Sequence, residues 1–152
     1  MREILFRGKP GRSSDWVEGD LIQIPGGRVY IIDNKFGACI DDKGNLINSE
    51  YPFVCEVLPE TVGQYTNLKD IDDKRIFEGD IVKRRRDGLI ATVVLCNGSW
   101  ELWNWTDEMF DDDFLSNWYN QCSYYGEEVG GCYVIGNVHD NPALLEMEKT
   151  DD

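Results

Sequence analysis

Two segments, WVEGDLIQI (Trp16–Ile24) and IFEGDIVKR (Ile76–Arg84), place Glu-Gly-Asp between an apolar pair and a short strand-like run. A polar turn precedes each copy. A glycine-containing turn and a second apolar run follow it: PGG and RVYIID in the first copy, DG and LIATVVL in the second. Apolar runs separated by such turns are typical of β-hairpins. The repeat therefore predicts two equivalent hairpin-based halves.

We expect both copies to be structural turn motifs, formed by Glu18, Gly19, Asp20, Glu78, Gly79 and Asp80. Glycine adopts the positive φ or strained bend that other residues resist, and aspartate hydrogen-bonds nearby backbone amides as the chain turns. The alternative is that the carboxylates bind a metal ion or act as acid and base. No further ligand set lies near them in the sequence.

The second copy continues into a predicted three-stranded meander over residues 80–105. Asn97-Gly98 stands between two apolar runs, which is the strongest short hairpin signal. A meander of this kind is typical of a small SH3-like barrel. In the first half, Phe36–Asn48 suggests another hairpin and Pro52–Leu58 another strand.

The hydrophobic period changes after the meander. Phe110, Phe114 and Trp118 recur every four residues, which predicts one helix near 107–121. Cys132–Val138 then predicts a returning strand. Asn141-Pro142 predicts the start of a short terminal helix, with Asn141 as its cap.

The predicted fold class is therefore mainly β, with α+β character at the C-terminal end and small barrel-like antiparallel sheets. We expect an N-terminal β-hairpin half over 1–60, a meander-plus-helix half over 61–148 and a mobile tail over 149–152. The pattern leaves open whether the halves are separate or interleaved.

Composition limits the classes of function. The 152 residues carry a net charge of −14, and residues 101–152 hold 13 acidic side chains and one basic side chain. No apolar run has the roughly 20 residues of a membrane span, and the start lacks the features of a signal peptide, so we expect a cytoplasmic protein. Five cysteines without a CxxC pair and a single histidine, His139, indicate reduced thiols and neither a metal centre nor a cofactor.

Five blocks in order resemble the YopX-like family of phage and prophage proteins: ILFRGK (Ile4–Lys9), WVEGDLI (Trp16–Ile22), ETVGQYTNLKD (Glu60–Asp70), IFEGDIV (Ile76–Val82) and VIGNVHDNPALL (Val134–Leu145). Asn67 stands where a glycine is usual in that pattern. The resemblance implies a mostly β fold and a phage origin. It implies no catalytic activity and supplies no site residues.

Two clusters are candidates for partner binding. The basic run Lys83, Arg84, Arg85 and Arg86 could grip phosphates, with Trp103 and Trp105 as stacking surfaces. Its alternative is a solvated hairpin tip, or one that pairs with the acidic third of the chain. Asp111, Asp112 and Asp113 could imitate nucleic-acid phosphates, or could simply favour the start of a helix. Trp118 and its aromatic neighbours suit docking onto a second subunit, and equally suit a local core.

The sequence favours a non-catalytic accessory protein that binds macromolecules, as a homo-oligomer and with a host or phage protein as partner. The alternatives are a small-barrel protein that binds nucleic acid and an acidic mimic of nucleic acid. The net charge opposes nucleic acid at long range. No nucleophile accompanies His139, and no nucleotide-binding motif occurs, so an enzyme is not expected.

Overall fold

The structure, a computed structural model, describes residues 2–12, 15–33, 43, 54–86, 88–103 and 131–146. The chain forms two compact units, Met1–Tyr65 and Thr66–Asp152. The sequence placed the division after residue 60, whereas the structure places it inside a strand that runs from the first unit into the second.

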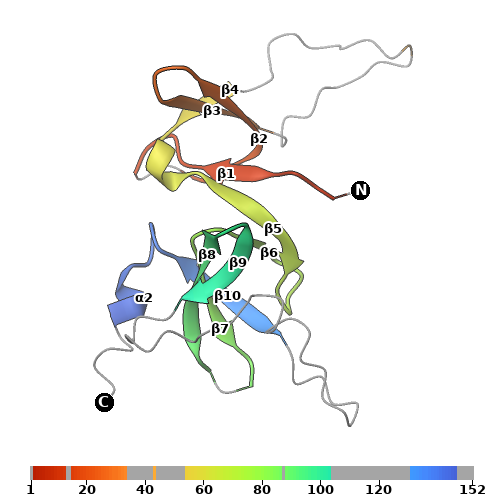
Figure 1. The fold of residues 1–152 in the computed structure, drawn as a ribbon, viewed down its shortest axis with the longest axis vertical. Helices are drawn as coiled ribbons and strands as arrows, with labels where there is room; N and C mark the ends of the chain where they lie inside the picture. Colours follow the sequence, from red (N-terminus) through yellow and green to blue (C-terminus); the bar gives the residue numbers. More distant parts are fainter. Residues whose placement is uncertain are drawn as a thin grey trace. The chain divides into compact units, whose positions relative to one another are not determined.

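The first unit is an antiparallel sheet. Its elements are β1 (Phe6–Gly8), β2 (Val17–Ile24), β3 (Arg28–Asp33), β4 (Val54–Val57), the 3₁₀ turn η2 (Pro59–Thr61) and the start of β5 (Gly63–Lys69). The strand order is β4-β3-β2-β1-β5, and Figure 1 shows β2 and β3 as a hairpin. Its turn contains Gly26 and Gly27, both with positive φ. Val29, Ile31 and Val57 form the core on one face of the sheet.

The second unit is a strongly curled sheet that forms a half-barrel (Figure 1). Its elements are β6 (Arg75–Phe77), β7 (Asp80–Arg84), β8 (Ile90–Cys96), β9 (Ser99–Trp103), β10 (Cys132–Asn137) and the helix α2 (Ala143–Glu146). The order of the four-stranded sheet is β10-β7-β8-β9, and β6 lies beside β5. The core cluster on the inner face consists of Ile76, Val82, Ala91, Val93, Leu102 and Cys132.

The meander predicted for 80–105 is confirmed as β7, β8 and β9. Asn97 and Gly98 both have positive φ, 50° and 80°, and they join the paired residues Cys96 and Ser99. A two-residue type I′ turn requires positive φ at both central positions, and its twist matches that of the flanking strands. The local Asn-Gly signal therefore determines the register of this hairpin.

The returning strand is also confirmed: β10 pairs with β7. Asp70 fixes the turn beside it. One carboxylate oxygen of Asp70 accepts hydrogen bonds from the backbone N–H groups of Asp72 (2.9 Å) and Lys74 (2.8 Å), and the other accepts from Val134 of β10 (3.0 Å). The acidic turn that follows Asp70 is thus tied to the strand edge through the Asp70 carboxylate, which accepts from backbone N–H groups on both.

The short terminal helix exists as α2, but Asn141 does not cap it in the expected way. The Asn141 side-chain oxygen accepts from the backbone N–H of Asn137 at 3.3 Å, and only the Asn141 carbonyl accepts from Leu144. Gly136 makes room for the start of α2, because a Cβ there would lie 2.6 Å from Asn141 Oδ1 and 2.9 Å from the Leu144 side chain. The helix therefore packs over the β10 side of the curled sheet.

The fold class is mainly β, as predicted. The predicted hairpin over 36–48, the helix near 107–121 and the tail over 149–152 lie outside the described residues, apart from Lys43. Among the described residues, no helix is long and apolar enough to cross a membrane.

Candidate partner-binding surface

The first Glu-Gly-Asp motif is not a turn, and the prediction for Glu18, Gly19 and Asp20 is wrong. All three residues lie inside β2, with Gly19 paired to Phe6 of β1 and to Asp33 of β3. A Cβ on Gly19 would overlap the carbonyl oxygen of Ile32. The glycine is needed here because β3 approaches closely, not because the chain bends.

The second motif does form a turn. Glu78 and Gly79 join β6 to β7, Gly79 has φ of 87°, and Asp80 begins β7. The buried Asp80 carboxylate accepts a hydrogen bond from the backbone N–H of Phe77 at 2.7 Å. Gly79 donates to Val93 and accepts from Val138, both at 2.9 Å. The same tripeptide thus serves two different local structures.

His139 lies on the turn that follows β10. Its backbone N–H donates to the Asn137 side-chain oxygen at 3.0 Å, as does that of Asp140 at 2.9 Å. Its ring nitrogen Nε2 comes within 3.8 Å of where a Cβ would sit on Gly79. Within the described ranges, no group of three or more His, Cys, Asp or Glu side chains could hold a metal ion.

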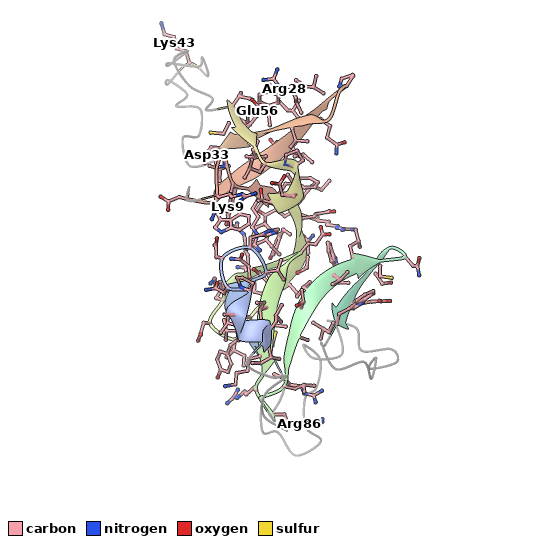
Figure 2. The ribbon with its side chains drawn as sticks, turned by 90° about the vertical axis from the view of Figure 1, so that its left-hand side faces the viewer. Lys9, Arg28, Asp33, Lys43, Glu56 and Arg86 are labelled. Atoms are coloured by element: carbon pink, nitrogen blue, oxygen red, sulfur yellow. The ribbon has the colours of Figure 1, made fainter. Side chains whose placement is uncertain are left out.

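The basic run Lys83–Arg86 lies at the end of β7 and in the turn that follows it. Lys83, Arg85 and Arg86 are exposed and Arg84 is half-buried. Figure 2 shows Arg86 at the tip of this hairpin. The turn is held by backbone hydrogen bonds from Gly88 to Arg84 (2.8 Å) and from Arg85 to Gly131 (3.1 Å). The three exposed cations are therefore presented on an ordered backbone.

Strand register places Lys83 and Trp103 on the same face of the second sheet. Ile81 pairs with Thr92, which pairs with Trp103, while Lys83 pairs with Ile90 and with Tyr133. Directly paired residues share a face, as do residues two apart in a strand. We call Lys83, Ile90, Thr92, Trp103 and Tyr133 the outer face of the second sheet. The core cluster occupies the opposite face.

Trp103 is the most exposed aromatic side chain of this face, at 54%. Its indole N–H donates to the Glu101 carboxylate at 3.0 Å, which fixes the ring orientation on the edge strand β9. Strand spacing and residue rise put the Cα atoms of Trp103 and Lys83 roughly 12 Å apart. A cation and an oriented aromatic ring thus lie on the same side of the sheet, at exposed positions separated by the buried Ile81 and Thr92.

The sequence prediction missed Tyr133 and treated Lys83, Arg84, Arg85 and Arg86 as one cluster. Tyr133 faces Lys83 across the β7–β10 pair, whereas Arg84 pairs with Cys132 on the inner face. Alternation along Cys132–Asn137 could have identified Tyr133 once the strand partner was known. Trp105, Asp111, Asp112, Asp113 and Trp118 lie outside the described residues.

A second cluster, missed from the sequence, lies in the first unit. Arg7 and Lys9 are both buried and both approach the Trp16 ring, with the Arg7 guanidinium carbon 4.5 Å and the Lys9 Nζ 5.5 Å from its centroid. Lys9 Nζ also donates to the Arg12 carbonyl at 3.0 Å. The spacing of Arg7 and Lys9, two residues apart at the end of β1, was the available signal. Their burial suits a structural role.

The described cysteines are free thiols: Cys55, Cys96 and Cys132. Burial, together with the negative charges of Asp70 and Asp80, raises the pKa of the Cys132 thiol from 9.0 to about 12. The thiolate is the reactive form of cysteine. Cys132 is therefore a core side chain rather than a nucleophile.

The chain matches the sequence model of a known protein family. The model described as "YopX protein" matches residues 5–146, nearly the whole length. The chain belongs to the YopX protein family. Its solved structural relatives include protein EF1440 from Enterococcus faecalis, with a TM-score of 0.50 and 20% identity over 95% of this chain and 99% of that one. This likeness is one of fold. No curated protein matches the chain.

The five sequence blocks that resemble the family contact one another in the structure. The first block, Ile4–Lys9, meets the second, Trp16–Ile22, where β1 pairs with β2 and where the Arg7 and Lys9 side chains approach the Trp16 ring. The fifth block, Val134–Leu145, is joined to the third by the hydrogen bond from Val134 to Asp70. It is joined to the fourth by the hydrogen bond from Val138 to Gly79. Asn67, in the third block, has φ of 66°, a conformation that favours glycine. These contacts hold the two units together internally, and the residues of the outer face of the second sheet lie outside the five blocks.

Proposed function

We propose that this YopX family protein is a non-catalytic binding module that recognises a partner protein through the outer face of its second sheet. The observation that carries the proposal is that strand register puts Lys83, Tyr133 and the exposed Trp103 on one side of the sheet, with the exposed cations of Arg85 and Arg86 in the turn that follows β7. Tryptophan, tyrosine and arginine are the residues that most often dominate binding energy at protein interfaces.

The chemistry of the surface specifies the kind of partner. A partner that docks here has an apolar pocket for the Trp103 ring and acidic groups opposite Lys83 and the Arg85–Arg86 turn. The charge of the chain, −14, repels acidic partners at long range, so salt should change the association rate in a measurable way. As an accessory protein of a phage or prophage, the module would act in the cytoplasm of the bacterial host.

Nucleic acid is the second candidate, because the same surface combines exposed cations with an aromatic ring. Proteins that bind single strands use a basic groove together with stacking aromatic side chains. The protein partner is favoured because the surface offers few cations on a strongly acidic chain. The acidic residues Asp111–Asp113, proposed as a mimic of nucleic acid, remain a sequence prediction.

Affinity capture from phage-carrying host cells tests both candidates. The wild type is compared with Trp103→Ala and with Arg85→Glu/Arg86→Glu, and each sample is divided into nuclease-treated and untreated halves. The matched control is Lys74→Glu/Arg75→Glu, which reverses two exposed charges elsewhere in the same unit. We expect one protein to survive nuclease, to be lost in both surface variants and to remain in the control.

Two results would count against the protein-binding function. Loss of the captured material on nuclease treatment would favour nucleic acid instead. Equal capture by the wild type and both surface variants would mean that the outer face of the second sheet is not the contact.

A further inference from the structure

The first unit carries an apolar face that its own core does not use. Register places Ile22 opposite Tyr30, and Ile32 opposite Val54, on the side of the sheet away from Val29, Ile31 and Val57. The apolar members of this outward side are Ile22, Ile24, Tyr30, Ile32 and Val54, and we call them the apolar face of the first sheet. An antiparallel sheet with one face on the core normally presents polar side chains on the other.

Exposure shows that this face is accessible. Ile22 is 38% exposed, Ile24 44% and Val54 48%, and these residues come from β2 and β4, the two strands that flank β3. Single exposed apolar residues are ordinary, but a contiguous patch on three neighbouring strands marks an interaction surface. The continuous apolar run Val29–Ile32 has the pattern of a strand covered on both faces.

The charges at the border of this face are few and mutually compensated. Arg28 donates two hydrogen bonds of 3.0 Å to the Glu56 carboxylate and lies 5.7 Å from the Tyr30 ring centroid. Figure 2 shows Arg28 and Glu56 side by side. Hydrogen bonding to Arg28 lowers the pKa of Glu56, so the pair stays charged and balanced at neutral pH. Arg7 and Glu18, paired across β1 and β2, also lie on this side, and Asp20 is a further acidic group in its register.

We propose that the apolar face of the first sheet is a self-association interface, occupied by the same face of a second copy of this chain. Two chains of charge −14 repel each other, so they can approach only where charge is low, and this face combines low charge with apolar area. In a two-fold symmetric dimer the same face of each copy forms the interface, so both apolar faces are covered. The inference is independent of the function proposed for the second sheet.

The size of the face sets the expected affinity. Three strands by five residues give a footprint of about 240 Å². A standard interface covers about 800 Å² per partner, so this face supplies the apolar centre of a small interface. The account predicts a reversible dimer with a Kd of about 10–100 μM.

Sedimentation velocity of the full chain, from about 1 μM to about 500 μM, tests the proposal. The variant Ile24→Lys/Val54→Lys places two charges in the face, and we expect at least a tenfold rise in Kd, roughly the effect of losing a hot-spot side chain. The matched control is Ile71→Lys/Leu95→Lys, which makes the same change at side chains that are 38% and 43% exposed in the second unit. Its Kd should equal that of the wild type, and circular dichroism verifies that both variants are folded.

The charge change and the salt dependence separate this interface from an electrostatic one. Both lysine pairs change the net charge from −14 to −12 and so reduce repulsion between copies, which would by itself strengthen association. Added salt should maintain or strengthen a dimer held by the apolar face, because it screens that repulsion. A wild type that stays monomeric at every concentration would overturn the proposal. So would a dimer that salt dissociates, or one that both lysine pairs weaken equally.

Discussion

Substituting alanine in the two Glu-Gly-Asp motifs should destabilise the protein by different amounts and for different reasons. At Gly79, an added Cβ has room, since its nearest neighbour lies at 3.6 Å, and the penalty is only that of φ at 87°. A left-handed conformation costs a non-glycine residue about 1–2 kcal/mol. Gly79→Ala should therefore reduce the free energy of unfolding by about that amount.

At Gly19 the cause is a collision with the backbone. The Cβ would overlap the Ile32 carbonyl oxygen, so β2 and β3 must separate near the pair Gly19–Asp33. Loss of two or three ladder hydrogen bonds, at about 1 kcal/mol each, and disturbed packing of Ile31 give about 3 kcal/mol or more. That is a large part of the roughly 5–15 kcal/mol that stabilises a typical domain.

Asparagine distinguishes the two mechanisms because it tolerates the left-handed region. Gly79→Asn should recover much of the stability lost in Gly79→Ala, whereas Gly19→Asn should be at least as harmful as Gly19→Ala. Urea unfolding followed by circular dichroism measures the stabilities. Hydrogen exchange shows whether protection falls in β2 and β3 or in β7 and β8. Equal losses at the two glycines, or no recovery with asparagine at residue 79, would refute the assignment.

Three further substitutions test other parts of the structure. Asn67 has φ of 66°, and its buried side-chain Nδ2 makes no hydrogen bond in the described part of the chain. Asn67→Gly should therefore raise the free energy of unfolding by up to about 1 kcal/mol. A lower urea midpoint for this variant would contradict the prediction. Asp70→Ala leaves three backbone N–H groups without their acceptor and should lower the free energy of unfolding by about 3 kcal/mol, with Asp70→Asn intermediate. Equal urea midpoints for the two variants would be inconsistent with a carboxylate that accepts three hydrogen bonds. Burial raises the pKa of Cys132 in the folded protein from 9.0 to about 12, so the contribution of the thiol to the free energy of unfolding is complete below pH 9 and is lost as the pH rises toward 12. Cys132→Val should therefore flatten the fall in stability over that range, and identical pH profiles for the two proteins would argue against a buried thiol.

The sequence predicted the parts of the fold that depend on local signals. Asn97-Gly98 identified the β8–β9 hairpin because both residues tolerate positive φ. The apolar runs of β3 and β4 likewise predicted strands. The equivalence of the two Glu-Gly-Asp copies failed, because the role of Gly19 depends on the Ile32 carbonyl of a neighbouring strand and not on its own flanking residues.

The binding surface was only partly predictable for a related reason. Exposure of Lys83, Arg85 and Arg86 follows from their charge, but their association with Trp103 and Tyr133 depends on the register of four strands. Likewise, the run Val29–Ile32 indicates a strand covered on both sides without indicating what covers it. Pairing partners distant in sequence determine both surfaces.

The most direct test of partner recognition replaces Trp103 with a photo-crosslinking aromatic residue in host cells. The matched position is Leu95, an apolar side chain of the neighbouring strand β8 that is 43% exposed and belongs to the inner side of the sheet. The account predicts one protein adduct at residue 103 and none at residue 95, with the adduct lost when Arg85 and Arg86 are changed to Glu. Equal adducts at both positions, or none at either, would contradict recognition through the outer face of the second sheet.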